Sequence, residues 1–122
     1  MSDPNFVILY AENPANSAAF YVGLLGKPPV EASPTFAMFA LESGVMLGLW
    51  AAHTVQPQAT VAGGAEIAFA VDGIATVNAM HAEWCGKGLK IVQAPTAVDF
   101  GFTFVALDPD GHRLRVFAPG AG

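Results

Sequence analysis

The chain has 122 residues, enough for one domain with a hydrophobic core, and a formal net charge of −5. Its five lysines and arginines are too few for the basic face that neutralises nucleic-acid phosphates, which excludes a nucleic-acid partner and favours a neutral or cationic ligand. Charged residues make up only 12% of the chain, about half the usual share, so we expect apolar surface to be hidden in an oligomer or a ligand cleft.

The single cysteine, Cys85, excludes a disulfide or a cysteine cluster within one chain, and we expect it to be a small buried residue near a helix end. No apolar run is long enough to span a membrane, and no charged-then-apolar leader opens the chain. The sequence therefore predicts a cytoplasmic protein without a membrane partner.

The first half predicts a strand, a helix and a hairpin. After a strand over Phe6–Ala11, Asn13 caps a helix over Pro14–Leu25, and Gly26 ends it. One face of this helix is apolar: Ala18, Tyr21, Val22 and Leu25. A short edge strand begins at Val30, and alternating residues over Phe36–Trp50, with a turn at Gly44, predict a β-hairpin.

Residues 51–64 form a linker without a clear hydrophobic periodicity. After the linker, the second half of the chain repeats the order of elements of the first half. A strand over Glu66–Val71 leads to Asp72, the expected cap of a helix over Ile74–Gly86. The apolar face of that helix is Ile74, Val77, Met80, His81 and Trp84. An edge strand over Leu89–Val92 and a loop over Thr96–Gly101 then lead to a second hairpin, over Phe102–Phe117, whose turn is Asp108–Gly111.

The repeat predicts an α+β fold. Each copy reads as strand, helix and three strands, so two βαβββ modules of about residues 5–50 and 65–118 build a single domain over 1–122. We expect a cupped, mostly antiparallel eight-stranded sheet with the helices on its outer face.

This arrangement resembles the vicinal oxygen chelate superfamily, which includes glyoxalase I, extradiol dioxygenases, fosfomycin-resistance enzymes and bleomycin-resistance proteins. The resemblance rests on the repeat, on the Asp108–Gly111 turn and on a helix carrying Ser17, Phe20 and Tyr21. Enzymes of that family hold a divalent ion with His or Glu side chains inside the cup. The resemblance places Phe6, Gly48, Glu66 and Arg115 at those positions.

These four residues predict that no metal is bound. Phe6 and Gly48 offer no ligand atom from a side chain, and Arg115 is a permanent cation. Glu66 alone is one carboxylate where a catalytic ion needs about three protein ligands. The histidines, His53, His81 and His112, lie on separate elements and are expected to be solvated or capping residues.

Strand alternation predicts an aromatic pocket instead. The expected ligand-binding residues are Phe6, Tyr10, Met46, Gly48, Trp50, Glu66, Asp99, Phe100, Phe104 and Arg115. Phe104 is expected opposite Arg115, Glu66 is expected to pair with Arg115, and Asp99 and Phe100 are expected to close over the mouth. Four other large aromatics are assigned to the core: Phe36, Phe39, Phe69 and Trp84.

Among family members without a metal, the resemblance implies an antibiotic-binding resistance protein. The main hypothesis is a homodimer that sequesters a planar aromatic compound, phenazine-, mitomycin- or bleomycin-like, without cofactor and without catalysis. Two alternatives remain: a metal-dependent glyoxalase- or dioxygenase-like enzyme, and a structural or regulatory module with an empty cup.

Overall fold

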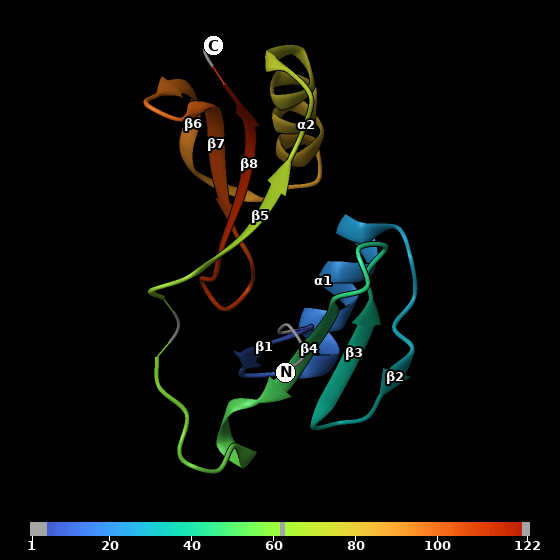
Figure 1. Cartoon of the computed structure of the whole chain (residues 1–122). Helices are drawn as coiled ribbons and strands as arrows, with labels where there is room; N and C mark the ends of the chain where they lie inside the picture. The colour runs from blue at the N-terminus through green and yellow to red at the C-terminus, as the bar shows by residue number, and fades with distance from the viewer. Residues whose placement is uncertain (1–4, 62, 121–122) are drawn as a thin grey trace. The chain divides into compact units, whose positions relative to one another are not determined.

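The computed structural model describes residues 5–61 and 63–120. The chain divides into two compact units, residues 1–62 and 63–122, and this boundary lies within the segment expected to be a linker (Figure 1). Each unit contains one helix and a four-stranded sheet. The linker itself carries one turn of 3-10 helix, Ala52–Thr54.

The first unit has the predicted order of elements, and its sheet has the order β1-β4-β3-β2. The two central hairpin strands are antiparallel, whereas β1 runs parallel to β4. Its elements are β1 (Phe6–Ala11), α1 (Pro14–Leu25), β2 (Glu31–Ala32), β3 (Phe36–Ala40) and β4 (Met46–Ala51).

The second unit repeats this topology with the order β5-β8-β7-β6, and β5 runs parallel to β8. The two βαβββ modules and the α+β fold class are therefore confirmed. Their eight strands pair as two four-stranded sheets, one in each unit. The elements are β5 (Glu66–Ala70), α2 (Ile74–Gly86), β6 (Lys90–Val98), β7 (Gly101–Leu107) and β8 (Arg113–Pro119).

Both helices have the predicted bounds, but they begin differently. The side chain of Asn13 accepts a hydrogen bond from the amide of Asn16 at 3.2 Å, and Gly26 ends α1 in the left-handed conformation at φ 71°. The predicted cap of α2 was wrong: Gly73 is the N-cap, in extended backbone. Asp72 instead accepts a hydrogen bond from the Thr76 hydroxyl at 2.7 Å.

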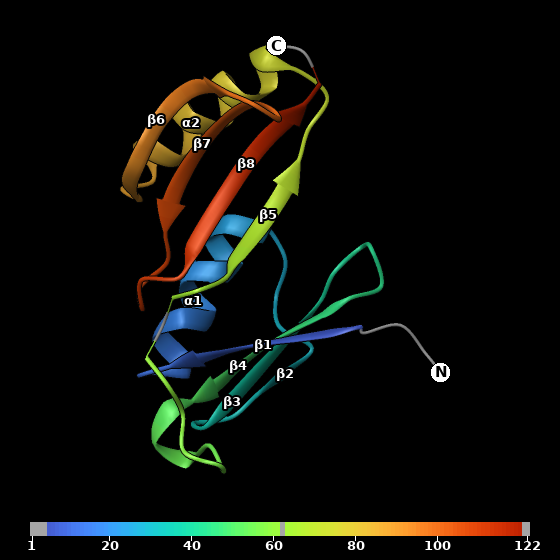
Figure 2. The ribbon, with the colours of Figure 1, turned by 60° about the vertical axis from the view of Figure 1, so that its left-hand side comes forward.

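In the first unit, α1 packs on β3 and β4 (Figure 2). Tyr21 is 1% exposed and its ring lies 6.4 Å from that of Phe39, which is fully buried. The buried residues of α1 are Pro14, Ser17, Ala18 and Tyr21. Val22, expected on that face, is 38% exposed because the buried face turns toward Ser17.

In the second unit, α2 lies along β6, β7 and β8 (Figures 1 and 2). Trp84 packs edge-on against both Phe69 and Phe104, with ring centroids 5.5 and 5.2 Å away. Val77 is also fully buried, whereas Ile74, expected on the same face, is 41% exposed at the start of the helix. One face of each sheet is thus covered by the helix of its own unit.

Strand β6 of the second unit is longer than expected. Strand β6 continues past Pro95 to Val98, with register shifts between Ile91 and Gln93 and between Gln93 and Thr96. An edge strand tolerates a proline at such irregular pairing because no ladder hydrogen bond is needed there. The loop expected over Thr96–Gly101 therefore shrinks to a tight turn at Asp99 and Phe100.

Within the described residues, neither helix is long and apolar enough to cross a membrane.

Candidate functional site

The helix-free face of the first sheet is lined by large apolar side chains. Strand register sets this face, because residues paired across neighbouring strands point to the same side. Phe6 pairs with Met46, Ile8 with Gly48, and Tyr10 with Trp50. Phe36 pairs with Trp50 from the other side, and Met38 with Gly48. We call this set the aromatic face: Phe6, Ile8, Tyr10, Phe36, Met38, Met46, Gly48 and Trp50.

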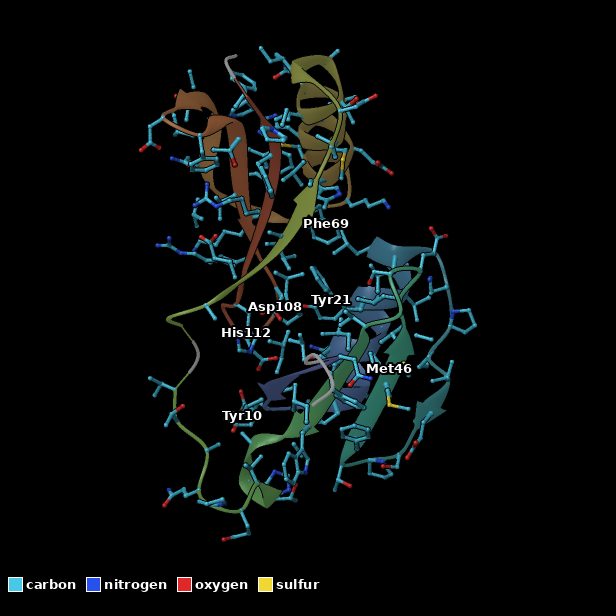
Figure 3. The ribbon with its side chains drawn as sticks, in the orientation of Figure 1. Tyr10, Tyr21, Met46, Phe69, Asp108 and His112 are labelled. Carbon is cyan, nitrogen blue, oxygen red and sulfur yellow. The ribbon has the colours of Figure 1, made fainter. Side chains whose placement is uncertain are left out.

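The aromatic face is half exposed, whereas the opposite face of the same sheet is the core. Phe6 and Ile8 are each 43% exposed, and Tyr10, Met46 and Trp50 are half-buried. Figure 3 labels Tyr10 and Met46 on the strands and Tyr21 on α1. The first-unit residues expected in the ligand site therefore do share one face that no helix covers.

Gly48 lies beneath two phenyl rings. A Cβ added at this position would lie 3.0 Å from Cζ of Phe36 and 3.1 Å from Cε1 of Phe6. The missing side chain is what lets both rings approach the strand. Phe36 had been assigned to the core, which was wrong; its pairing with Trp50 in the hairpin is the signal that could have placed it here.

The helix-free face of the second sheet carries a polar cluster around Arg115. Its guanidinium donates to Glu66 through two hydrogen bonds, Nε to Oε2 at 2.8 Å and Nη2 to Oε1 at 3.0 Å. The remaining nitrogen, Nη1, donates to Thr103 Oγ1 at 3.2 Å and to Gln93 Oε1 at 3.4 Å. The pairing expected between Glu66 and Arg115 is confirmed. Gln93 and Thr103 were not foreseen, because the register between β6, β7 and β8 decides their position.

Phe100 extends this cluster from the β6–β7 turn. Its ring lies 5.7 Å from the guanidinium carbon of Arg115 and packs edge-on against Phe117 at 6.0 Å. Phe100 is 46% exposed, and Asp99 beside it is exposed too. The turn thus brings Phe100 onto the face that holds Arg115.

The electrostatics of the pair favour both charged forms. The hydrogen bond from Arg115 lowers the pKa of Glu66 below its usual range; burial opposes this effect, and the positive charges of Arg115 and Arg113 lower the pKa further. The hydrogen bond from Glu66 raises the pKa of Arg115. A bidentate pair of this kind holds the guanidinium in one orientation.

Phe104 does not lie in this cluster, which corrects the expected site. Val105, not Phe104, pairs with Arg115, and Phe104 pairs with Val116 on the helix-covered face. Phe104 is fully buried, in contact with Trp84 and His81. The expected register was off by one residue because the β7–β8 turn has five residues between the paired Leu107 and Arg113.

The three histidines and the cysteine lie outside the strands that form the helix-free faces. His81 packs edge-on against Phe104 at 5.3 Å, and its Nε2 lies 3.5 Å from Sγ of Cys85 on the next turn of α2. Cys85 is exposed, so the expectation of a buried thiol was wrong. His53 lies in the 3-10 turn, and His112 belongs to the β7–β8 turn, where its amide donates to Asp108 Oδ1 at 2.8 Å (Figure 3).

The residues at the family's metal positions do not fit a divalent ion. Both oxygens of Glu66 accept hydrogen bonds from Arg115, and the guanidinium occupies another of the four positions. The side chains of Phe6 and Gly48 supply no atom that could coordinate a metal ion. In residues 5–61 and 63–120, no three His, Cys, Asp or Glu side chains gather as a metal site would require.

Among the described residues, each unit forms a cavity from its own side chains and backbone. The first, of about 620 Å³, is formed by the linker and is lined by Ala52, His53, Val55, Gln56, Gln58, Ala59, Thr60 and Val61. The second, of about 500 Å³, lies at the start of β5 and is lined by Gly63, Gly64, Ala65, Glu66, Gly111 and Arg113. The second cavity therefore adjoins the polar cluster through Glu66.

Comparison with known proteins agrees with the fold. The phenazine antibiotic resistance protein EhpR of Enterobacter agglomerans is 28% identical over 116 residues, which cover 93% of this chain and 89% of EhpR. A protein of Agrobacterium tumefaciens with a solution NMR structure is 50% identical, with a TM-score of 0.90 over 99% of this chain and 100% of its own.

More distant structures share the fold alone. A glyoxalase-related enzyme from Fulvimarina pelagi has a TM-score of 0.83 at 21% identity, over 97% of this chain and 88% of its own. The profile of one superfamily matches residues 4–116, nearly the whole chain, which confirms the family resemblance. The chain belongs to the Glyoxalase/Bleomycin resistance protein/Dioxygenase superfamily.

Proposed function

We propose that this protein binds a planar aromatic small molecule, of the phenazine type, and releases it chemically unchanged. Binding would act by sequestration in the cytoplasm, so that the compound cannot reach its target. The observation that carries the proposal is the aromatic face, where Phe6, Phe36 and Trp50 flank a glycine on a side of the sheet that no helix covers.

The physical support comes from stacking and from open space. Offset or edge-on aromatic pairs contribute about 0.5–1.5 kcal/mol beyond the burial of their area. Small-molecule sites are mostly apolar, with a few polar groups that fix orientation. The aromatic face supplies the mostly apolar surface that such a site requires.

The comparison with EhpR supports the ligand class. EhpR is described as a phenazine antibiotic resistance protein, and the alignment covers most of both chains. At 28% identity, this relation favours binding as the activity that the two proteins share. Which compound this protein binds is a question for experiment.

An enzymatic alternative is a metal-dependent glyoxalase- or dioxygenase-like reaction on the same fold. The pairing of Glu66 with Arg115 disfavours it, because the carboxylate would have to exchange two hydrogen bonds for an ion. Elemental analysis after purification, combined with activity assays with and without chelator, separates the two functions.

The experiment is a titration of phenazine followed by tryptophan emission. Trp50 lies on the aromatic face, whereas Trp84 is 3% exposed in the core beside α2. We expect saturable quenching in the wild type and in Trp84→Phe, and its loss in Trp50→Phe. Chromatography should recover the phenazine unmodified. Absence of saturable binding by calorimetry, or conversion of the compound, would contradict the proposal.

We also propose that the functional unit is a homodimer. The exposed apolar residues of β1, Phe6, Val7 and Ile8, lie on an edge strand, and the chain is poor in charge. A second copy would cover this surface. Sedimentation equilibrium should then report twice the mass of the 12.6 kDa chain, and a monomer at all concentrations would contradict the dimer.

A further inference from the structure

The linker cavity, of about 620 Å³, begins where the chain leaves the first sheet. All eight of its lining residues fall within residues 52–61, which belong to the first unit. Figures 1 and 2 show the linker, in light green, continuing from the end of β4. The first lining residue, Ala52, comes two positions after Trp50 of the aromatic face. The cavity and the aromatic face are therefore parts of the same unit.

The course of the backbone at the end of β4 puts Ala52 on the aromatic side of the sheet. Successive side chains of a strand point to opposite faces. Trp50 lies on the aromatic face, whereas the next residue, Ala51, is fully buried on the other face. The backbone of Ala51, with φ −56° and ψ 117°, lies close to the extended region. The alternation therefore continues to Ala52, and the cavity wall begins about 7 Å along the chain from Trp50.

The first part of the linker is tied to the end of β4. The hydroxyl of Thr54 donates a hydrogen bond to the carbonyl oxygen of Ala51 at 2.8 Å. The amide of Val55 donates to the carbonyl oxygen of Ala52 at 3.4 Å, and Val55 is only 3% exposed. These contacts fix the near wall of the cavity relative to Trp50.

The polar groups in the cavity wall form hydrogen bonds but carry almost no formal charge. The polar lining side chains are His53, Gln56, Gln58 and Thr60, and none of the lining residues apart from His53 is ionisable. Gln56 and Gln58 are exposed, and within the described part of the chain neither side-chain amide has a hydrogen-bond partner. Each amide offers two N–H donors and one carbonyl acceptor to a ligand.

Such a wall fits a neutral substituent that both donates and accepts hydrogen bonds. A primary carboxamide can pair with a glutamine amide through two hydrogen bonds, one in each direction. A carboxylate can only accept, and its charge would meet no lysine or arginine in the lining. A neutral ligand is also what the net charge of −5 favours.

We propose that the linker cavity binds a primary carboxamide carried by the aromatic ligand, through Gln56 and Gln58, while the ring stacks on the aromatic face. This inference rests on the proposed function and narrows its ligand to a carboxamide-bearing planar aromatic. The aromatic face holds the ring system, which many compounds share. Gln56 and Gln58 are then the specificity-determining residues that distinguish among these compounds.

The test compares phenazine-1-carboxamide, phenazine-1-carboxylic acid and unsubstituted phenazine by calorimetry at neutral pH. We expect the wild type to bind the carboxamide about fivefold more tightly than either of the others, as one net hydrogen bond gives. In the double variant Gln56→Ala, Gln58→Ala, the ratio of these affinities should fall to about one. Each single variant should lose part of the preference.

Asn16→Ala is the matched control, because it also removes an exposed side-chain amide from the first unit. Asn16 belongs to α1, which packs on the other face of the sheet, so this variant should retain the full preference for the carboxamide. Circular dichroism of all variants checks that these exposed substitutions leave the fold intact.

The outcomes separate this inference from the proposed function. If phenazine binds but the wild type does not prefer the carboxamide, or if the glutamine variants keep the preference, the linker cavity is not the substituent site although the binding function stands. If none of the three compounds binds, the proposed function fails and this inference fails with it.

Discussion

Gly48 is the position where a single side chain would change the aromatic face most. A methyl group there would come within 3.1 Å of both Phe6 and Phe36, closer than ordinary van der Waals contact. Both rings are partly exposed, so they can move aside at little cost to the fold. Displaced rings would instead weaken the binding of any molecule that stacks against them.

We therefore predict that Gly48→Ala weakens phenazine binding about tenfold, the loss of roughly one stacking contact, while the free energy of unfolding changes by less than about 1 kcal/mol. Gly23→Ala on α1 is the matched control, since a Cβ there meets nothing within 4 Å. Calorimetric titration and urea unfolding of both variants provide the measurement. Unchanged affinity in Gly48→Ala would place the ligand elsewhere.

The Glu66–Arg115 pair predicts a pH dependence of stability. Its hydrogen bond from Arg115 lowers the pKa of Glu66 in the folded state. A lowered pKa stabilises the fold at and above the unfolded-state pKa, about 4.3, and this contribution disappears as pH falls through the folded pKa. Since both side chains are partly solvated, the effect at neutral pH is at most about 1 kcal/mol.

Urea unfolding of wild type and Glu66→Gln between pH 7 and pH 2 measures this contribution. We expect the wild type to be more stable at neutral pH and the two curves to converge in the acid range. A gap that persists to the lowest pH would show that the charge of Glu66 is not responsible.

These residue-scale features were partly predictable from the sequence. The pairing of Glu66 with Arg115 follows from the opposite charges on neighbouring strands, whereas the faces on which Phe36 and Phe104 lie depend on hairpin register.

At the scale of elements, the bounds of both helices followed from the sequence because caps and stops are local signals. Asn13, Pro14 and Gly26 act through backbone groups within one turn of themselves. Strand β6 was predicted too short because Pro95 suggested an end, and only its edge position and irregular pairing allow it to continue to Val98. The length of the turn between β7 and β8 decides which residues of the two strands pair. An error of one residue in that length places the side chains of a strand on the opposite face of the sheet.

The start of β7 provides a test at this scale. Gly101 has φ of 149°, and a Cβ there would overlap the carbonyl oxygen of Ala118 on β8. We predict that Gly101→Ala lowers the free energy of unfolding by about 1–3 kcal/mol, because the backbone must shift as well as accept a strained φ.

Gly111→Ala serves as the control, since it shares the positive φ of 88° but has open space around the added Cβ. Its loss of stability should be clearly smaller than that of Gly101→Ala in the same urea unfolding experiment. Equal losses would mean that backbone conformation alone, without the contact to Ala118, explains the effect.

At the scale of the whole molecule, the internal repeat predicted two units of like topology, and both have it. Repetition is visible in the sequence because each unit uses the same order of strand, cap, helix and hairpin. The sequence did not show that the eight strands divide into two separate sheets. Whether strands on either side of the linker pair with one another has no local signal in the sequence. The two helix-free faces therefore carry different chemistry: one is aromatic, and the other is centred on Arg115.

The most direct test of the central claim, that the aromatic face binds a flat ring, is chemical-shift mapping of the ¹⁵N-labelled protein with phenazine. We predict that the largest amide shifts fall on β1 and β4, around Ile8, Gly48 and Trp50, and that α1 changes little. Shifts confined to the helices, or no shifts at saturating phenazine, would contradict the account.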